Sequence, residues 1–238
     1  MRVLLCFAWV LLGLVMVAFH FGPGQSALVL DQTGSSLRKA KAHAAEGNWL
    51  SAVSAYEAAL GTIPPERKAE TRAIRVERAK AFLEGSQLPN AYNDLIGLVE
   101  DMREDPDRDP AVFADAQSTL ASARYYLTWL MRLEGLPQDV WEEEIEAARQ
   151  TYRLLTEQAL ASQDQEVAQL HQQNMESSIR LARMDLEELQ GLSLPKQCKG
   201  CSSGNCKNPG RKKKKEGKKK QEDVRGASSG LPPDSGGS

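Results

Sequence analysis

Apolar residues recur at spacings of three and four over residues 36–190, and this periodicity constrains the fold more than any other feature of the sequence. Such spacing is typical of amphipathic helices. The same stretch contains no apolar–polar alternation of the kind that marks strands, and no Asn-Gly or Asp-Gly pair that would close a β-hairpin. It therefore predicts an all-α domain built from seven helices, joined by short turns and packed as antiparallel hairpins.

Prolines, glycines and capping residues divide this region into its helices. Asp109 is expected to cap a helix that begins at Pro110, and Gly135 to end that helix. Asp139 is expected to cap the next one. The expected helices cover approximately residues 35–46, 49–61, 66–84, 89–102 and 110–133, then one that follows Asp139, and finally residues 164–190.

The N-terminus is dominated by an almost uninterrupted apolar stretch, Val3–Phe21, preceded only by Met1 and Arg2. It is longer than the apolar part of a typical signal peptide (roughly 7–15 residues) and close to the roughly 17–25 residues that span a bilayer. Residues 22–27 then interrupt the helix and offer cleavage points. We therefore expect residues 1–27 to be either a transmembrane anchor, which the length favours, or a cleaved signal peptide.

Both interpretations place the bulk of the chain on the exported side, periplasmic or extracytoplasmic, either anchored or secreted. Arg2 is the only charged residue before Asp31, so the basic end stays cytoplasmic. The expected organisation is a linker over 28–34, a helical domain over 35–190 and a disordered tail over 191–238.

Charge separates the tail from the body of the chain. Residues 191–238 carry 12 basic and 4 acidic side chains, which leaves 18 basic and 28 acidic ones for residues 1–190. The tail consists largely of Gly, Ser, Pro and Lys, with few apolar side chains to bury, and such a composition predicts disorder.

One run in the helical region, GNWLSAVSAYEAALGTIP, has a recurring pattern of small and aromatic residues. Its members, expected to pack between helices, are Gly47, Trp49, Ala52, Tyr56, Ala59, Leu60 and Pro64. The run resembles the second helix of a tetratricopeptide repeat. The resemblance is best over 33–64, weaker over 72–103, where a second copy follows about 39 residues later, and degenerate over 110–160. An unrelated helical bundle is the alternative.

The resemblance implies an array of stacked hairpins with a concave face that binds another polypeptide. In the register of the repeat, Lys41 and Lys80 would point into this concave face at equivalent places, where they could bind an acidic partner; solvated lysines on a polar helix face are the alternative. The carboxylate-binding Lys, Asn and Arg set of chaperone-binding members is not present, which speaks against recognition of chaperone tails.

Nothing in the sequence points to catalysis. No phosphate-binding Gly-Lys-Ser/Thr loop occurs, and the three histidines, His20, His43 and His171, are scattered. The acidic run over 142–146 fits the first turns of a helix, where carboxylates interact favourably with the helix dipole. We therefore expect a protein that is not an enzyme and has no required cofactor.

Three cysteines in the tail allow a different interpretation. Cys198 and Cys201 have the Cys-x-x-Cys spacing of a zinc chelate, and Cys206 follows, but a fourth ligand is missing. Zinc would therefore need a water molecule or a group from a partner. In an exported chain a disulfide between two of the three is the stronger alternative, and a redox pair or three unpaired cysteines remain open.

The segment 211–220 contains eight basic residues and one acidic residue. Such a run binds phosphate-bearing surfaces with little selectivity. On the exported side, anionic lipid or an acidic wall polymer fits better than nucleic acid, and the segment has no aromatic residue to stack on bases. A purely solubilising tail is the alternative.

Together these features predict a non-catalytic, membrane-associated scaffold that binds another protein on the exported side. The first alternative is a metal- or thiol-handling protein that uses the three tail cysteines. The second is an adaptor that uses its polybasic tail to bind anionic lipid, wall polymer or nucleic acid.

Overall fold

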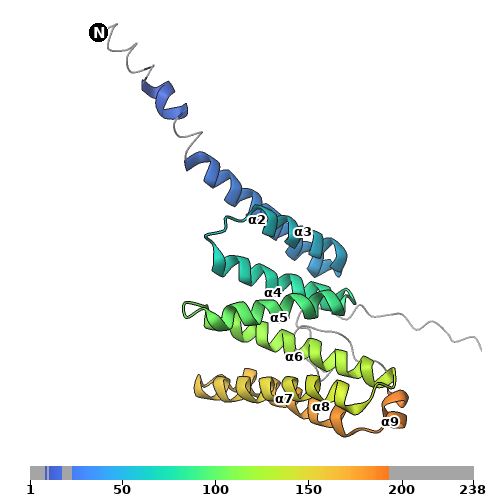
Figure 1. The fold of residues 1–238 in the computed structure, drawn as a ribbon. Helices are drawn as coiled ribbons and strands as arrows, with labels where there is room; N and C mark the ends of the chain where they lie inside the picture. Colours follow the sequence, from blue (N-terminus) through green and yellow to red (C-terminus); the bar gives the residue numbers. More distant parts are fainter. Residues whose placement is uncertain (1–8, 10, 18–22, 193–238) are drawn as a thin grey trace, which may run out of the picture. The chain divides into compact units, whose positions relative to one another are not determined.

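The computed structural model describes residue 9, residues 11–17 and residues 23–192. The chain divides into two units, residues 1–206 and 207–238, and every described residue belongs to the first. Residues 11–17 are helical. The other described helices are α2 (Pro23–Glu46), α3 (Trp49–Thr62), α4 (Lys68–Glu84), α5 (Leu88–Glu104), α6 (Pro110–Leu133), α7 (Gln138–Ala161), α8 (Gln165–Arg183) and α9 (Leu186–Gly191). No strand occurs among the described residues, so the expected all-α class is confirmed (Figure 1).

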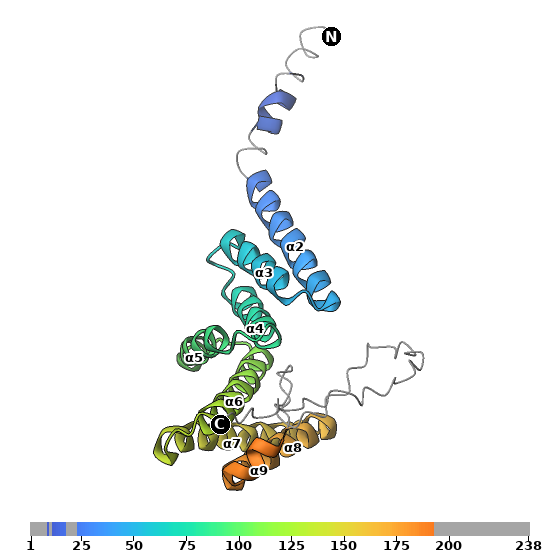
Figure 2. The same ribbon diagram turned by 90° about the vertical axis from the view of Figure 1, so that its right-hand side faces the viewer.

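The helices of residues 23–192 pack in chain order. From α2 to α8 each helix packs against the next, and α4 also packs against α6 while α9 packs against α6. In Figure 2, α3 lies to the left of α2 and α5 to the left of α4, so the second helices of these two hairpins lie on the same side. A contact between alternate helices is what stacking of two-helix units produces.

Four of the turns between helices close in the same way. In each, one residue has a positive φ, and the next residue's N–H donates to the carbonyl oxygen five positions earlier, as in a Schellman motif. The residues with positive φ are Gly47 (79°), Ser86 (59°), Gly135 (74°) and Gln163 (61°). The corresponding bonds are Asn48 N–His43 O (2.8 Å), Gln87 N–Phe82 O (2.8 Å), Leu136 N–Met131 O (3.0 Å) and Asp164 N–Ala159 O (2.9 Å).

The other two connections within 23–183 contain proline instead. Pro64 and Pro65 lie between α3 and α4, and Pro106 lies between α5 and α6. Because proline fixes φ and lacks an N–H, it prevents these loops from continuing the preceding helix. As far as α7, tight turns therefore alternate with these proline loops and define the hairpins α2–α3, α4–α5 and α6–α7. The α7–α8 turn is also tight, so α8 follows α7 without a proline loop.

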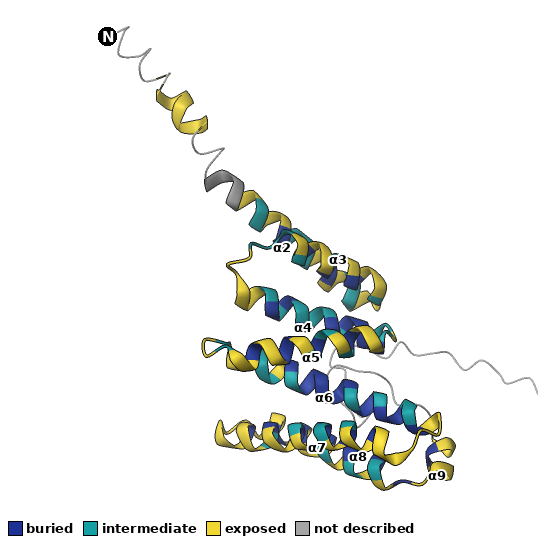
Figure 3. Cartoon of the chain, viewed as in Figure 1, coloured by how far each residue is buried: buried dark blue, intermediate teal, exposed yellow. Residues whose placement is uncertain are grey.

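Most of the apolar interior forms one cluster that runs from Ala40 in α2 to Leu189 in α9. A second, much smaller cluster contains Ala121, Ala148 and Tyr152, with Met175 packed against it. Figure 3 shows the consequence for α4 and α6, which have buried or half-buried residues along most of their length, while the other helices have longer exposed stretches.

The first helix of the helical domain, α2, starts earlier than expected. The interruption at 22–27 and the linker at 28–34 were expected outside the first helix, but α2 begins at Pro23 and includes residues 28–34. Proline is favoured in the first turn of a helix, where its missing N–H has no intrahelical partner to lose. Thr33 is buried, and its hydroxyl lies 2.9 Å from that of Thr62 in α3. This part of the chain therefore packs as part of the first hairpin.

Two further expectations about helix ends need correction. Pro137, rather than Asp139, is the N-cap of α7, and Asp139 lies in its first turn. The helix expected over 164–190 is two helices, because Met184 has extended backbone and Asp185 caps α9 by accepting a hydrogen bond from the Glu188 N–H (2.7 Å). By contrast, Asp109 caps α6 as expected, accepting from the backbone N–H of Ala111 (2.8 Å).

Candidate interaction surfaces

The run that resembles a tetratricopeptide helix lies in α3 and the turn before it. Ala52, Tyr56 and Ala59 are buried. Trp49 and Leu60 are half-buried against the main core, and Gly47 supplies the left-handed turn. Pro64 lies, half-buried, in the loop that follows. Burial and the nearby negative charge of Glu77 raise the pKa of Tyr56 to about 12, so its hydroxyl stays neutral.

The weaker second copy also lies in the interior. Its seven marker positions fall in α4, in α5 and in the turn between them, and six of them are buried: Ala79, Phe82, Leu88, Ala91, Leu95 and Leu98. The seventh, Gly85, allows a close approach, because a Cβ there would lie 3.2 Å from Cβ of Trp49. The first two hairpins therefore meet where a small residue faces a large aromatic one.

The two lysines expected at equivalent places on a concave face have different environments. Lys41 is exposed on α2. Lys80 is only 11% exposed, and its ammonium group pairs with Asp115 of α6 (2.5 Å) and with Glu77 (2.8 Å). These carboxylates raise the pKa of Lys80 despite the opposing effect of its burial. Lys80 therefore joins α4 to α6, and its charge is already compensated within the array.

The α4–α5 hairpin is held by arginine–aspartate pairs. Arg72 pairs with Asp101 (3.0 Å) and Asp105 (2.5 Å). Arg75 and Arg78 both pair with one carboxylate, that of Asp94, at 2.8 Å each. Hydrogen bonding from Arg72 lowers the pKa of Asp105. These charges fix the relative position of the two helices and are not free for a ligand.

A carboxylate of the acidic run in α7 connects three helices. Glu144 accepts a hydrogen bond from the Tyr92 hydroxyl of α5 (2.6 Å) and lies 3.4 Å from the guanidinium of Arg124 in α6. Burial and this carboxylate raise the pKa of Tyr92 to about 12. The run was expected to lie in the first turns of a helix and to interact with the helix dipole; Glu146 pairs with Arg149 of the same helix. Glu144 instead has a structural role.

Several polar side chains of α6, α7 and α8 are buried. We call this set the polar seam; its members are Ser122, Tyr152, His171, Asn174 and Ser178, all buried. The hydroxyls of Ser122 and Tyr152 lie 2.8 Å apart, and the rings of Tyr152 and His171 stack with centroids 6.1 Å apart. Burial lowers the pKa of His171, and within the described part of the chain its Nδ1 has no hydrogen-bond partner.

Arg132 of α6 binds the C-terminal end of α8. Its guanidinium donates to the backbone carbonyls of Leu181 and Met184, and it stacks over the ring of Trp141 at 4.7 Å. Burial lowers the pKa of Arg132, an effect that Asp185 partly opposes. Because the carbonyl groups at a helix C-terminus lack intrahelical donors, a buried cation satisfies them and fixes where α8 ends.

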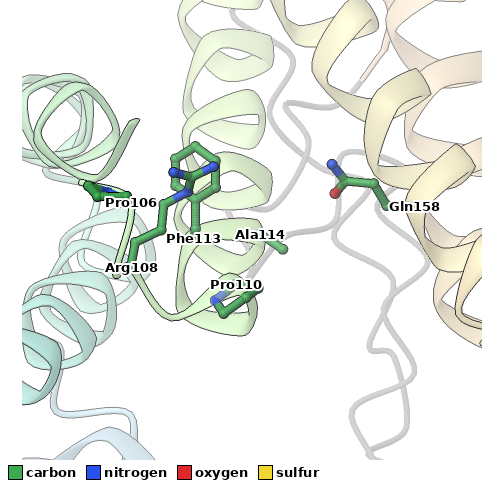
Figure 4. Close-up of a pocket in the computed structure, with 6 residues that line it drawn as sticks. All are labelled: Pro106, Arg108, Pro110, Phe113, Ala114 and Gln158. Atoms are coloured by element: carbon green, nitrogen blue, oxygen red, sulfur yellow. The ribbon is translucent and has the colours of Figure 1, made fainter. Parts of the chain in front are cut away.

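A hollow of about 400 Å³ opens beside the α5–α6 loop (Figure 4). It is lined by Pro106, Arg108, Pro110, Phe113, Ala114 and Gln158. Arg108 lies over the ring of Phe113 at 4.6 Å, and Gln158 of α7 lies across the opening from them. No motif in the sequence points to this hollow, although the two prolines that flank Arg108 are a signal for a rigid loop.

The remaining predicted site residues fall outside the described residues. This applies to Cys198, Cys201 and Cys206 and to the basic segment 211–220. Within the described part, no three His, Cys, Asp or Glu side chains are grouped so that they could hold a metal ion. Nor is any helix in that part long and apolar enough to cross a membrane.

No protein-family model matches the chain, and comparisons with curated proteins and with solved structures gave no match.

Proposed function

We propose that this protein is a non-catalytic scaffold that uses its helical array to bind another protein. The observation that carries the proposal is the packing of α4 against α6 in addition to the sequential contacts. Alternate helices that touch in this way form a continuous surface to which successive hairpins contribute, and stacked-hairpin proteins use such surfaces for binding. The resemblance of residues 33–64 to a tetratricopeptide repeat supports the same function.

The internal neutralisation of charge is also consistent with a scaffold. Arg72, Arg75, Arg78 and Lys80 all bind carboxylates on neighbouring helices. Such pairs keep the positions of the helices fixed without leaving a polar cluster whose charges are poised for chemistry. A rigid array binds a partner with a small entropic cost, because its surface is already in place before binding.

We further propose that the array is exported and stays at the membrane. The support is the apolar N-terminal stretch with its single preceding arginine, and the exposure of the described side chains within it. Leu11, Leu14 and Met16 are each more than 60% exposed. Contiguous exposed apolar side chains of this kind are rare on proteins that face only water.

An affinity pull-down from solubilised membranes tests the scaffold function. The full chain is compared with a version ending at Leu194 and with Ala52→Asp, which introduces a charge into the core. We expect one partner in stoichiometric amount with the first two proteins and none with the third. If the partner is lost when the tail is removed, function resides in the cysteine- and lysine-containing segment. If no partner is recovered with any protein, the scaffold function is wrong.

Membrane retention and cleavage are tested separately, by extracting membranes at alkaline pH and measuring the mass of the mature chain. An anchored protein stays in the membrane fraction at full mass. A mass that lacks the first 26 residues, together with release from the membrane, would instead identify a cleaved signal peptide.

A further inference from the structure

The hollow beside the α5–α6 loop is lined mainly by apolar residues, together with Arg108 and Gln158. Pro106, Pro110, Phe113 and Ala114 supply the apolar surface. Arg108 is held at one side by its stacking on Phe113 and by a hydrogen bond to the carbonyl oxygen of Asp105 (3.0 Å). A volume of about 400 Å³ lies at the small end of the range for ligand sites and admits one large apolar side chain.

Acidic residues are concentrated in the segment that leads into the α5–α6 loop beside this hollow. Residues 100–109 contain six acidic and two basic side chains. Two of the acidic residues, Asp101 and Asp105, are paired with Arg72. The other four are exposed and make no ion pair with a described residue: Glu100, Glu104, Asp107 and Asp109. We call these four the acidic rim. Its charge attracts cations and repels acidic ligands.

We propose that the hollow binds a basic peptide segment of a partner protein, with one bulky apolar side chain in the hollow and lysines or arginines against the acidic rim. This inference rests on the proposed scaffold function and names the chemistry of the partner. The complementary charge of the rim selects a basic segment, and the apolar floor selects the side chain between the cations. Lysine and arginine also have apolar stems that can cover Pro106 and Pro110.

The test uses the full-length chain in detergent and a fluorescent peptide with the sequence Gly-Lys-Lys-Leu-Lys-Lys-Gly. A second peptide replaces Leu by Gly, and a third replaces every Lys by Glu. We expect the leucine peptide to bind about tenfold more tightly than the glycine peptide, because tenfold corresponds to about 1.4 kcal/mol and burial of a leucine side chain supplies at least this much. The glutamate peptide should not bind.

Two pairs of variants locate the binding. Ala114→Phe fills the hollow, and its matched control Ala111→Phe adds the same ring at an exposed position that does not line it. The double variant Glu104→Lys/Asp107→Lys reverses the rim, and Glu134→Lys/Glu187→Lys reverses two exposed carboxylates elsewhere. We expect about tenfold weaker binding for the first member of each pair and less than about twofold change for its control. Circular dichroism establishes that each variant is folded.

Three results would overturn the proposal: equal affinity for the leucine and glycine peptides, an equal loss in both charge reversals, or no effect of Ala114→Phe. The second would mean a diffuse attraction to the acidic body of the chain. The proposed function itself is tested by the pull-down. If a partner is recovered there and is not displaced by the leucine peptide, only the assignment of the hollow fails; if no partner is recovered, the scaffold function fails.

Discussion

The α4–α5 hairpin and the α6–α8 region are both helical and well packed, yet their interiors are chemically different. Between α4 and α5 the interior is apolar, with residues such as Leu95 and Leu98, and the charges lie at its margin in arginine–aspartate pairs. Between α6 and α8 the interior contains the polar seam beside the small second cluster, in addition to the residues that these helices contribute to the main apolar cluster. The α4–α5 hairpin therefore combines an apolar interior with ion pairs at its margin, whereas the α6–α8 region has buried polar side chains in its interior.

The polar interior is tolerated because its hydroxyls find acceptors within their own helices. The hydroxyls of Thr119, Ser177 and Ser178 each donate to a carbonyl oxygen four residues earlier in their own helix. Such bonds satisfy the donor without a partner on another helix. The Ser122–Tyr152 contact in the seam, by contrast, joins hydroxyls of two helices. We therefore expect most hydroxyls in the α6–α8 region to contribute little to stability, whereas apolar residues in α3–α5 contribute much.

The largest effect is expected from a charge placed in the apolar part. Ala52 is completely buried, so Ala52→Asp should lower the free energy of unfolding by more than about 4 kcal/mol and unfold the first hairpin. Circular dichroism and thermal unfolding measure this. The control is Ser54→Asp, on the same helix at an exposed position. Similar melting temperatures for the two variants would contradict the assigned burial.

A cavity in the apolar part should have the next largest effect. Leu95 is fully buried in α5, and Leu95→Ala should lower the free energy of unfolding by about 2–5 kcal/mol. Urea unfolding provides the value. An unchanged slope against urea would show that only stability has changed. A loss below about 1 kcal/mol would mean that this hairpin is not held mainly by burial.

The polar seam should make stability depend on pH through His171. Its folded-state pKa lies below the ordinary value of 6.5, so the unfolded chain binds the proton more readily. The stabilising contribution of the neutral imidazole is then fully present above about pH 6.5 and decreases as the pH falls below that value. His171→Phe keeps a ring against Tyr152 but cannot take up a proton.

Melting temperatures at pH 7.5 and pH 5.5 test this expectation. The wild type should lose more stability between the two pH values than His171→Phe does. The test is whether the wild type loses more stability than His171→Phe, because the carboxylates titrate alike in both proteins and cancel in this comparison. Equal losses in the two proteins would mean that His171 is accessible to protons in the folded state.

The smallest effect is expected from the removal of a hydroxyl that bonds within its own helix. Ser178 is fully buried, and its hydroxyl donates to the carbonyl oxygen of Asn174 (3.0 Å). Ser178→Ala should change the free energy of unfolding by less than about 0.5 kcal/mol, because that carbonyl keeps its backbone bond. Urea unfolding of Ser178→Ala and Leu95→Ala under the same conditions compares their free energies of unfolding directly. A loss as large as that of Leu95→Ala would show that the seam hydroxyls do hold α8.

The sequence predicted the apolar part better than the polar part. The buried positions Ala52, Tyr56 and Leu95 follow a helical period, and that period is visible in the residue types. Ser122, Asn174 and Ser178 have residue types that are usually exposed, so only the three-dimensional packing shows that they are buried. The role of Glu144 was also missed, because its partners Tyr92 and Arg124 are distant in sequence.

Helix ends were predictable only where the residue type itself carries the signal. Gly47 and Gly135 adopt the positive φ for which glycine is suited, and Gly135 was expected to end its helix. Ser86 and Gln163 adopt the same conformation without any signal in their type. The end of α8 is also bound by Arg132, which lies some 50 residues earlier, and no local pattern reveals such a contact.

The alternation of tight turns and proline loops has a consequence for how such a chain can change in length. The bonds that close a turn, such as Asn48 N–His43 O, lie wholly within one hairpin. Duplication or loss of a hairpin at the proline loops therefore leaves the closure of every other hairpin intact. Evolution could thus lengthen or shorten this array by whole units, and a protein engineer could permute or splice it at Pro64–Pro65 and Pro106 for the same reason.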